Sequence, residues 1–141
     1  TQWLTRSPES YDVVVTSNMF GDIATDLGAV LQGGMGMAAS GNIGDTSAFF
    51  EPVHGSSPKY AGMNKVNPIA SINSIQLMMD WLGRKNNNQD LIQIGSLIDE
   101  SVADHLREGK GLTYDLGGDA TCSGIGESIA SRLSTKLQET M

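Results

Sequence analysis

The chain has 141 residues, enough for one domain with a buried core, and it carries sixteen acidic against nine basic residues. The resulting net charge of −7 repels phosphate backbones, so we expect no non-specific binding to nucleic acid. A single cysteine excludes an internal disulfide and fits a reducing cytoplasm, and no apolar run is long enough to cross a membrane. We therefore expect a cytoplasmic protein that binds neither nucleic acid nor membranes.

The first third of the chain is predicted to contain the end of a helix, a buried strand and a second helix. Residues 2–5 fit the end of a helix, and the first residue is a threonine, so we expect residues 1–141 to be a single α/β piece of a longer protein. Residues 11–16 are apolar on both faces, as in a strand inside a sheet. Residues 22–32 form a helix that ends at the two glycines after it. Apolar residues recur along this helix at helical spacing: Ile23, Leu27, Val30 and Leu31.

The middle of the chain and the segment before the last helix are predicted to be rich in loops. Residues 40–45 read as a turn-rich loop, and residues 48–50 as a short strand. A short strand at residues 112–114 fits within the loop of residues 111–118. Glycines cluster in these regions, which indicates special backbone turns.

Three amphipathic helices are predicted in the second half of the chain. Pro68 opens the first, which ends at Gly83. The second spans residues 90–108 and stops at Gly109, and Ser123 caps the third. The alternation of strands and helices favours an α/β fold in which helices pack on a small mixed sheet.

Two aspartates lie on one strip of the helix predicted over residues 22–32. Asp22 and Asp26 are four residues apart, so their side chains are neighbours and their like charges repel. The positive helix N-terminus or a bound cation would offset this repulsion, and carboxylate ligands suit magnesium or manganese. The alternative is a pair of acids in the first turn that faces water, because a two-residue pattern has low specificity.

A polar loop over residues 54–62 is the second informative stretch. His54 lies in a segment rich in glycine, serine and proline, and Lys59 and Tyr60 follow within reach. A cation, an aromatic ring and exposed backbone N–H groups would suit a nucleotide that carries an extra phosphate. An ordinary surface loop explains the same residues equally well.

Several other kinds of site are not supported. The sequence has no G-x-G-x-x-G after a strand and no P-loop motif. The two histidines lie far apart without a cysteine pair, which argues against zinc. His105 lies in a charged segment and is expected to be solvated, and Cys122 is expected to be inert packing.

Several stretches in order resemble the isocitrate/isopropylmalate dehydrogenase family of decarboxylating dehydrogenases. The family's signature segment is similar to residues 18–26 (NMFGDIATD) with 33–36 (GGMG). Its cofactor loop resembles residues 50–58 (FEPVHGSSP) with Asn67-Pro68, and its last cofactor-side loop resembles residues 115–118. The resemblance implies the C-terminal part of this fold: the cofactor-binding domain and the edge of the substrate and dimer domain.

The resemblance also implies the ligands. Asp22 and Asp26 would coordinate a magnesium or manganese ion that holds a small β-hydroxyacid substrate, and hydride would pass to NADP or NAD. The full-length enzyme would be a homodimer. The residues expected near the dinucleotide are Glu51, His54, Gly55, Ser56, Ser57, Lys59, Tyr60, Val66, Asn67, Tyr114 and Asp115.

The dinucleotide preference is read from a few of these positions. Lys59 and Tyr60, with Val66 and Tyr114, resemble the NADP-preferring pattern, in which a cation and a phenol hold the 2′-phosphate. The arginine that the pattern carries four residues after the tyrosine is replaced by Gly118. NADP is therefore favoured, and NAD stays the alternative.

The substrate is less well determined by these residues. Residues 51–54 (EPVH) resemble isopropylmalate-type members, whereas Lys59-Tyr60 and residues 65–68 resemble NADP-linked isocitrate dehydrogenases. We favour 3-isopropylmalate, with isocitrate second. The family's catalytic tyrosine and lysine and its substrate arginines have no counterpart here, so we expect no catalytic residue in this chain and no activity from it alone. A non-catalytic nucleotide- or metal-binding module is the remaining alternative.

Overall fold

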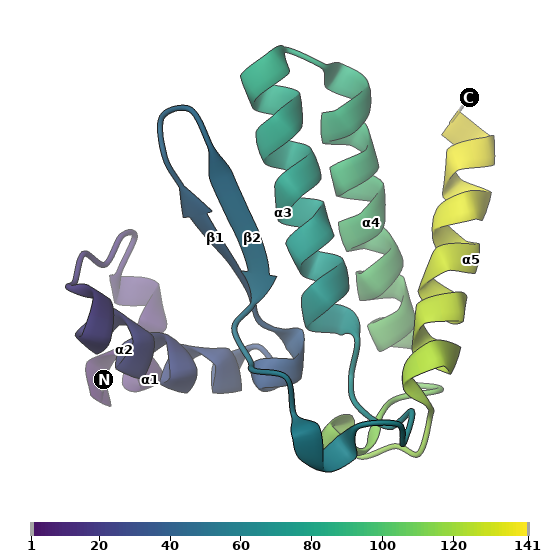
Figure 1. Ribbon diagram of the computed structural model, residues 1–141, viewed down its shortest axis with the longest axis horizontal. Helices are drawn as coiled ribbons and strands as arrows, with labels where there is room; N and C mark the ends of the chain where they lie inside the picture. The colour runs from purple at the N-terminus through teal and green to yellow at the C-terminus, as the bar shows by residue number, and fades with distance from the viewer. Residues whose placement is uncertain (1, 141) are drawn as a thin grey trace.

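The computed structural model describes residues 2–140, which form five α-helices and one β-hairpin (Figure 1). The helices are α1 (Gln2–Arg6), α2 (Asn18–Leu31), α3 (Ile69–Asn86), α4 (Gln89–Glu108) and α5 (Cys122–Thr140). The strands are β1 (Ala39–Ile43) and β2 (Ala48–Pro52). Short 3-10 turns occur at Pro8–Ser10, Met35–Met37, Pro58–Tyr60 and Tyr114–Leu116. None of the helices described is long and apolar enough to cross a membrane.

The last three helices and the hairpin lie side by side (Figure 1). The loops from β2 to α3 and from α4 to α5 lie at one end, and the turns between β1 and β2 and between α3 and α4 lie at the other (Figure 1). Helix α3 packs against the hairpin on one side and against α4 on the other, and α4 packs against α5. The core is apolar and draws on all three helices: Ile69, Val102, Ile125 and Ile129. Burying each of these side chains stabilises the fold by about 1.5–3 kcal/mol. The predicted α/β piece, with helices against a small sheet, is confirmed.

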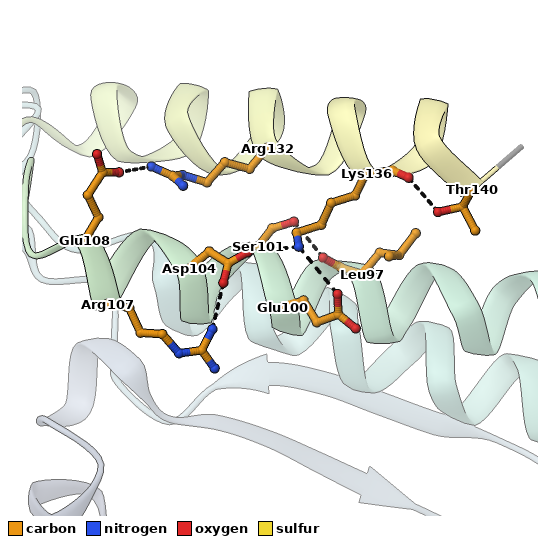
Figure 2. A network of polar contacts seen from close by, with 9 residues as sticks. All are labelled: Leu97, Glu100, Ser101, Asp104, Arg107, Glu108, Arg132, Lys136 and Thr140. Carbon is orange, nitrogen blue, oxygen red and sulfur yellow. Dashed lines mark hydrogen bonds and ion pairs between the residues drawn. The ribbon is translucent and has the colours of Figure 1, made fainter.

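Helices α4 and α5 are also joined by ion pairs along their outer faces (Figure 2). The ammonium of Lys136 lies 2.9 Å from Asp104 and 3.5 Å from Glu100. Arg132 on α5 pairs with Glu108 on α4. These side chains are partly exposed, so each pair adds little to the apolar core.

The predicted end of α3 at Gly83 is wrong. A Cβ atom at this position would lie 2.6 Å from Ile92 Cγ1, so the glycine allows α3 and α4 to approach closely here. The helix continues to Asn86 and ends at Asn87, which has a left-handed φ of 50°. The Asn88 side chain then caps α4 by accepting hydrogen bonds from the backbone of its first turn.

The sheet consists of two antiparallel strands in the described residues rather than the mixed strands expected. The strand expected at residues 48–50 is confirmed as part of β2. The loop expected at residues 40–45 is wrong, because most of it forms β1, with Ala39 opposite Pro52 and Ile43 opposite Ala48. Pairing with β2 and packing on α3 stabilise this strand despite its weak strand propensity.

The strand expected at residues 11–16 is also wrong. The segment has no strand assignment, and Val13 and Val15 are 81% and 92% exposed. No strand between residues 2 and 140 pairs with it, and an unpaired strand leaves its backbone groups without partners. The strand expected at residues 112–114 does not form either; a 3-10 turn follows at Tyr114–Leu116.

Helices α2 and α5 begin differently from the predictions. Helix α2 starts at Asn18, which places Asp22 in its second turn, where the helix dipole compensates a negative charge less. At the start of α5 the Gly124 N–H donates to the Thr121 hydroxyl at 3.1 Å, so Thr121 has the capping role expected of Ser123. Ser123 instead binds Asn64, through its backbone N–H and its hydroxyl.

His105 is buried, which contradicts the expectation that it is solvated. The side chain is 3% exposed, and its Nδ1 lies 3.0 Å from the Ser128 hydroxyl. Helix α5 covers this face of α4, although the neighbouring residues in the sequence are charged. The charges of Asp104, Arg107 and Glu108 lie on the more exposed faces.

Candidate functional site

A cavity of about 590 Å³ lies where three loops meet: the loop after α2, the loop after β2 and the loop before α5. It is lined by eight of the eleven residues predicted to lie near a dinucleotide: His54, Gly55, Ser56, Ser57, Val66, Asn67, Tyr114 and Asp115. Glu51, Lys59 and Tyr60 are not part of the lining. Residues 33–36, which the resemblance placed in the signature segment, also line the cavity. The fold thus brings together loops that are far apart in the sequence.

Asn67 joins these loops. Its side chain is 6% exposed; the amide nitrogen donates to Asp115 Oδ2 at 3.0 Å, and the amide oxygen accepts from the Ile69 N–H at 3.0 Å. The cavity wall therefore shares a hydrogen-bond network with the first turn of α3. Gly36 completes the junction, because a Cβ there would lie 2.9 Å from Asp115 Oδ2 and 3.0 Å from Asn67 Cβ.

The loop of residues 54–57 has a defined conformation. His54 is half-buried, and its Nδ1 lies 2.9 Å from the Gly55 carbonyl oxygen. Because a carbonyl oxygen only accepts, Nδ1 carries the hydrogen, and Nε2 of the neutral ring is left as an acceptor. Ser57 adopts a left-handed φ of 48°, which is unfavourable for a residue with a side chain. Such strained positions are common in ligand-binding loops.

A basic-aromatic cluster, defined as Lys59, Tyr60, Lys65 and Tyr114, lies at the edge of the cavity. The two tyrosine rings are 5.5 Å apart between centroids. The Lys65 ammonium lies 4.7 Å from the Tyr114 ring and 5.7 Å from the Tyr60 ring, and the Lys59 ammonium lies 5.4 Å from the Tyr60 ring. Cation–π attraction at these distances is worth about 0.5–1 kcal/mol at exposed sites.

The cluster changes the acidity of both phenols. A side-chain hydrogen bond from Tyr114 lowers the pKa of Tyr60, and the positive charges of Lys59 and Lys65 lower it further. The same hydrogen bond raises the pKa of Tyr114, which is its donor. The lysines therefore create a positive potential beside the two phenols.

Lys65 is the member of this cluster that the sequence reasoning missed as a site residue. It immediately precedes Val66, which was predicted, but nothing in its local pattern indicated contact with a ring 49 positions later. The signal available in the sequence was the run of Lys65 to Pro68.

The two predicted metal ligands lie on α2, outside the cavity lining. Asp22 and Asp26 are exposed and one helical turn apart, and they precede the glycines of the cavity wall by about three and two turns. No cluster of three or more His, Cys, Asp or Glu side chains suited to a metal occurs within residues 2–140. The pair can therefore supply two carboxylate ligands, and a complete shell would need oxygens from water, substrate or other protein groups.

Comparisons with known proteins identify the family of this chain. A model of the isocitrate/isopropylmalate dehydrogenase family matches residues 1–129. Homoisocitrate dehydrogenase of Methanocaldococcus jannaschii is 45% identical over 96% of this chain and 37% of its own length. The 3-isopropylmalate dehydrogenase of Thermobifida fusca is 44% identical over 94% of this chain and 35% of its own. The chain thus spans little more than a third of these relatives.

Solved structures give the same result. Isocitrate dehydrogenase of Methylococcus capsulatus has a TM-score of 0.83 at 35% identity, over 94% of this chain and 38% of that one. A β-decarboxylating dehydrogenase of Thermococcus kodakarensis has a TM-score of 0.82 at 38% identity, over 97% and 38% of the two chains. The chain belongs to the isocitrate/isopropylmalate dehydrogenase family.

Proposed function

We propose that this chain is the cofactor-side piece of an NAD(P)-dependent decarboxylating dehydrogenase that oxidises a small β-hydroxyacid. The observation that carries the proposal is the cavity of about 590 Å³, on which eight residues expected near a dinucleotide converge from separate loops. Family membership supports the reaction class, and the relatives named for homoisocitrate and 3-isopropylmalate oxidation support the substrate class.

The residues of the cavity have distinct tasks in this proposal. The loop of residues 54–57 offers backbone N–H groups and two serine hydroxyls to the adenosine half of the dinucleotide. Asn67 is buried and held at both ends of its amide, so it fixes the position of that loop relative to Asp115. Pre-organisation of this kind reduces the entropy lost on binding.

Asp22 and Asp26 are proposed to hold magnesium or manganese. Their like charges are one turn apart. Asp22 lies beyond the first turn, so the helix dipole compensates its charge less than it would compensate a carboxylate in the first turn. Carboxylate oxygens are the donors that these ions prefer. When bound, the ion would polarise the substrate's C–O bond, and the dinucleotide would accept hydride. The residues of this chain would hold the ion and the dinucleotide in place.

Among substrates we favour 3-isopropylmalate. NADP-linked oxidation of isocitrate is the second candidate, because the basic-aromatic cluster at the cavity edge suits a ligand with an additional phosphate. We also propose that the full-length protein is a homodimer, as the resemblance to the family implies.

The test is to replace each aspartate in the full-length protein by asparagine, as Asp22→Asn and Asp26→Asn, and to titrate Mn²⁺. Removing a direct ligand should weaken Mn²⁺ binding by at least the roughly 10- to 100-fold known for outer-shell partners, with a matching loss of turnover. Asp99→Asn, which removes an exposed aspartate from α4, is the control and should change neither quantity.

Two results would contradict the proposal. Unchanged Mn²⁺ affinity in both variants would remove the metal site from α2. Binding of Mn²⁺ and dinucleotide without turnover of either 3-isopropylmalate or isocitrate would instead indicate a non-catalytic binding module. The 141-residue chain by itself is expected to show no turnover.

A further inference from the structure

A second cavity, of about 400 Å³, lies where the end of α4 meets the start of α5. None of its lining residues also lines the main cavity, so the two cavities are separate features of the molecule. Besides small residues, its wall carries six polar or charged side chains: His105, Glu108, Lys110, Thr121, Ser128 and Arg132. A wall of this composition suits a polar ligand.

Two polar atoms of this wall are buried without a hydrogen-bond partner. They are Nε2 of His105 and Nε of Arg132, two of the four such side-chain atoms among the residues that the structure describes. His105 is 3% exposed, and its other ring nitrogen, Nδ1, lies 3.0 Å from the Ser128 hydroxyl. Burying a polar group without a partner costs free energy, because its contacts with water are not replaced. Two such groups on one cavity indicate a site that a polar ligand completes.

The backbone at Gly111 leaves room beside the imidazole ring. A Cβ at this lining residue would lie 3.8 Å from Cε1 of His105, the carbon between the two ring nitrogens. Gly111 has a left-handed φ of 66°, which side chains rarely adopt, so no side chain covers this edge of the ring. The ring edge therefore faces a part of the wall that consists of backbone alone.

The hydrogen-bonding groups at this cavity are mainly donors. Nε of Arg132 can only donate, and when the Ser128 hydroxyl donates to Nδ1 of the neutral ring, Nε2 of His105 is a donor too. Glu108 is the acidic side chain of the lining, and it already pairs with Arg132. Lys110 forms no ion pair in the part of the chain that the structure describes. In a chain of net charge −7, this local surplus of donors and positive charge favours an anion.

We propose that this cavity binds a phosphate-class oxyanion, either as the free ion or as a small phosphate monoester. Arg132 and Lys110 supply charge-assisted hydrogen bonds, and His105 supplies a further donor. These donors come from α5, from the loop after α4 and from α4 itself, so the bound oxyanion links the two helices. A ligand that binds the folded state alone also stabilises it. The inference is independent of the proposed function, because it involves neither the dinucleotide nor the two aspartates.

The test is calorimetric titration of inorganic phosphate into the full-length protein, in a phosphate-free buffer at constant ionic strength. Arg132→Gln should weaken phosphate binding about 10-fold, as expected for the loss of a hydrogen bond to a charged group. Lys110→Met should weaken it about 3-fold, because Lys110 is exposed and its contribution is screened by water. The matched control is Lys85→Met, which removes another exposed lysine outside this cavity and should change phosphate affinity less than 2-fold.

A second titration, with ribose 5-phosphate, distinguishes the two sources of the oxyanion. Tighter binding than that of inorganic phosphate, with the same loss in Lys110→Met, would identify a monoester as the ligand. Equal or weaker binding would identify the free ion. Both results support the site.

Three results would overturn the inference. They are a wild-type protein that binds neither probe, phosphate affinity that survives Lys110→Met, and an equal loss of affinity in Lys85→Met. Arg132→Gln also removes the pairing with Glu108, so Lys110→Met decides the question if the arginine variant does not fold. Each of these results leaves the dehydrogenase proposal intact, because dinucleotide binding and turnover are measured separately.

Discussion

The two ends of the chain differ in how they bury apolar residues. Helices α3, α4 and α5 share a core in which Ile69 and Ile125 are fully buried. Residues 2–31, by contrast, bury only Ala29 among the side chains described, and Val15 and Phe20 are 92% and 62% exposed. The C-terminal helices therefore supply the stability that supports the cavity, while the segment with the two aspartates contributes little to it.

In this comparison, removing a core side chain is expected to cause the largest loss of stability. Ile125→Ala leaves a space among α3, α4 and α5 and should lower the free energy of unfolding by about 2–5 kcal/mol. Val15→Ala removes an exposed side chain from the N-terminal segment and should change it by less than about 0.5 kcal/mol. Urea denaturation of the chain measures both values. Similar values for the two variants would show that the ends do not differ as described.

A smaller effect is expected from two glycine substitutions inside helices. Gly83→Ala forces a methyl group against Ile92 and should destabilise the chain by about 1–3 kcal/mol. Gly28→Ala in α2 meets no heavy atom within 4 Å and should stabilise the helix by about 0.5–1 kcal/mol. Thermal unfolding of both variants checks this difference. A stabilising Gly83→Ala would mean that α3 and α4 are not in close contact at that point.

Local patterns predicted the helices and the loop of residues 54–57 well. The 3.6-residue spacing of apolar residues identified α2 to α5, and the composition of residues 54–57 identified a loop that lines the cavity. Features that depend on distant partners were missed. β1 forms because β2 pairs with it, His105 is buried because α5 covers it, and Lys65 reaches a ring from another loop. Residues 11–16 show the converse: their strand-like sequence forms no strand and stays exposed, because no strand within residues 2–140 pairs with it.

The smallest effect concerns the ion pairs between α4 and α5 (Figure 2). A hydrogen bond from Lys136 lowers the pKa of Asp104. Because this pKa is lower in the folded state, the pair stabilises the fold at pH values above the ordinary pKa of aspartate. The contribution is lost as the pH falls through the lowered value. Both side chains are partly exposed, so the contribution is small.

Measurement of the unfolding free energy between neutral and acidic pH checks this sign. The wild-type chain should be slightly more stable than Lys136→Met near neutral pH, and the two curves should converge in acid. Lys110→Met, which removes an exposed lysine from the loop after α4, should follow the wild-type curve throughout. A gap that widens in acid would contradict the assigned pairing.

The central claim is that the loops around Asn67 bind a dinucleotide. Hydrogen–deuterium exchange of the full-length protein with and without NADPH tests it most directly, because it reports protection of each backbone segment. The account predicts protection at residues 33–36, 54–57 and 114–118, with no change at the α4–α5 face that carries Lys136. NADPH that binds but protects other segments, and leaves these three unchanged, would contradict the account.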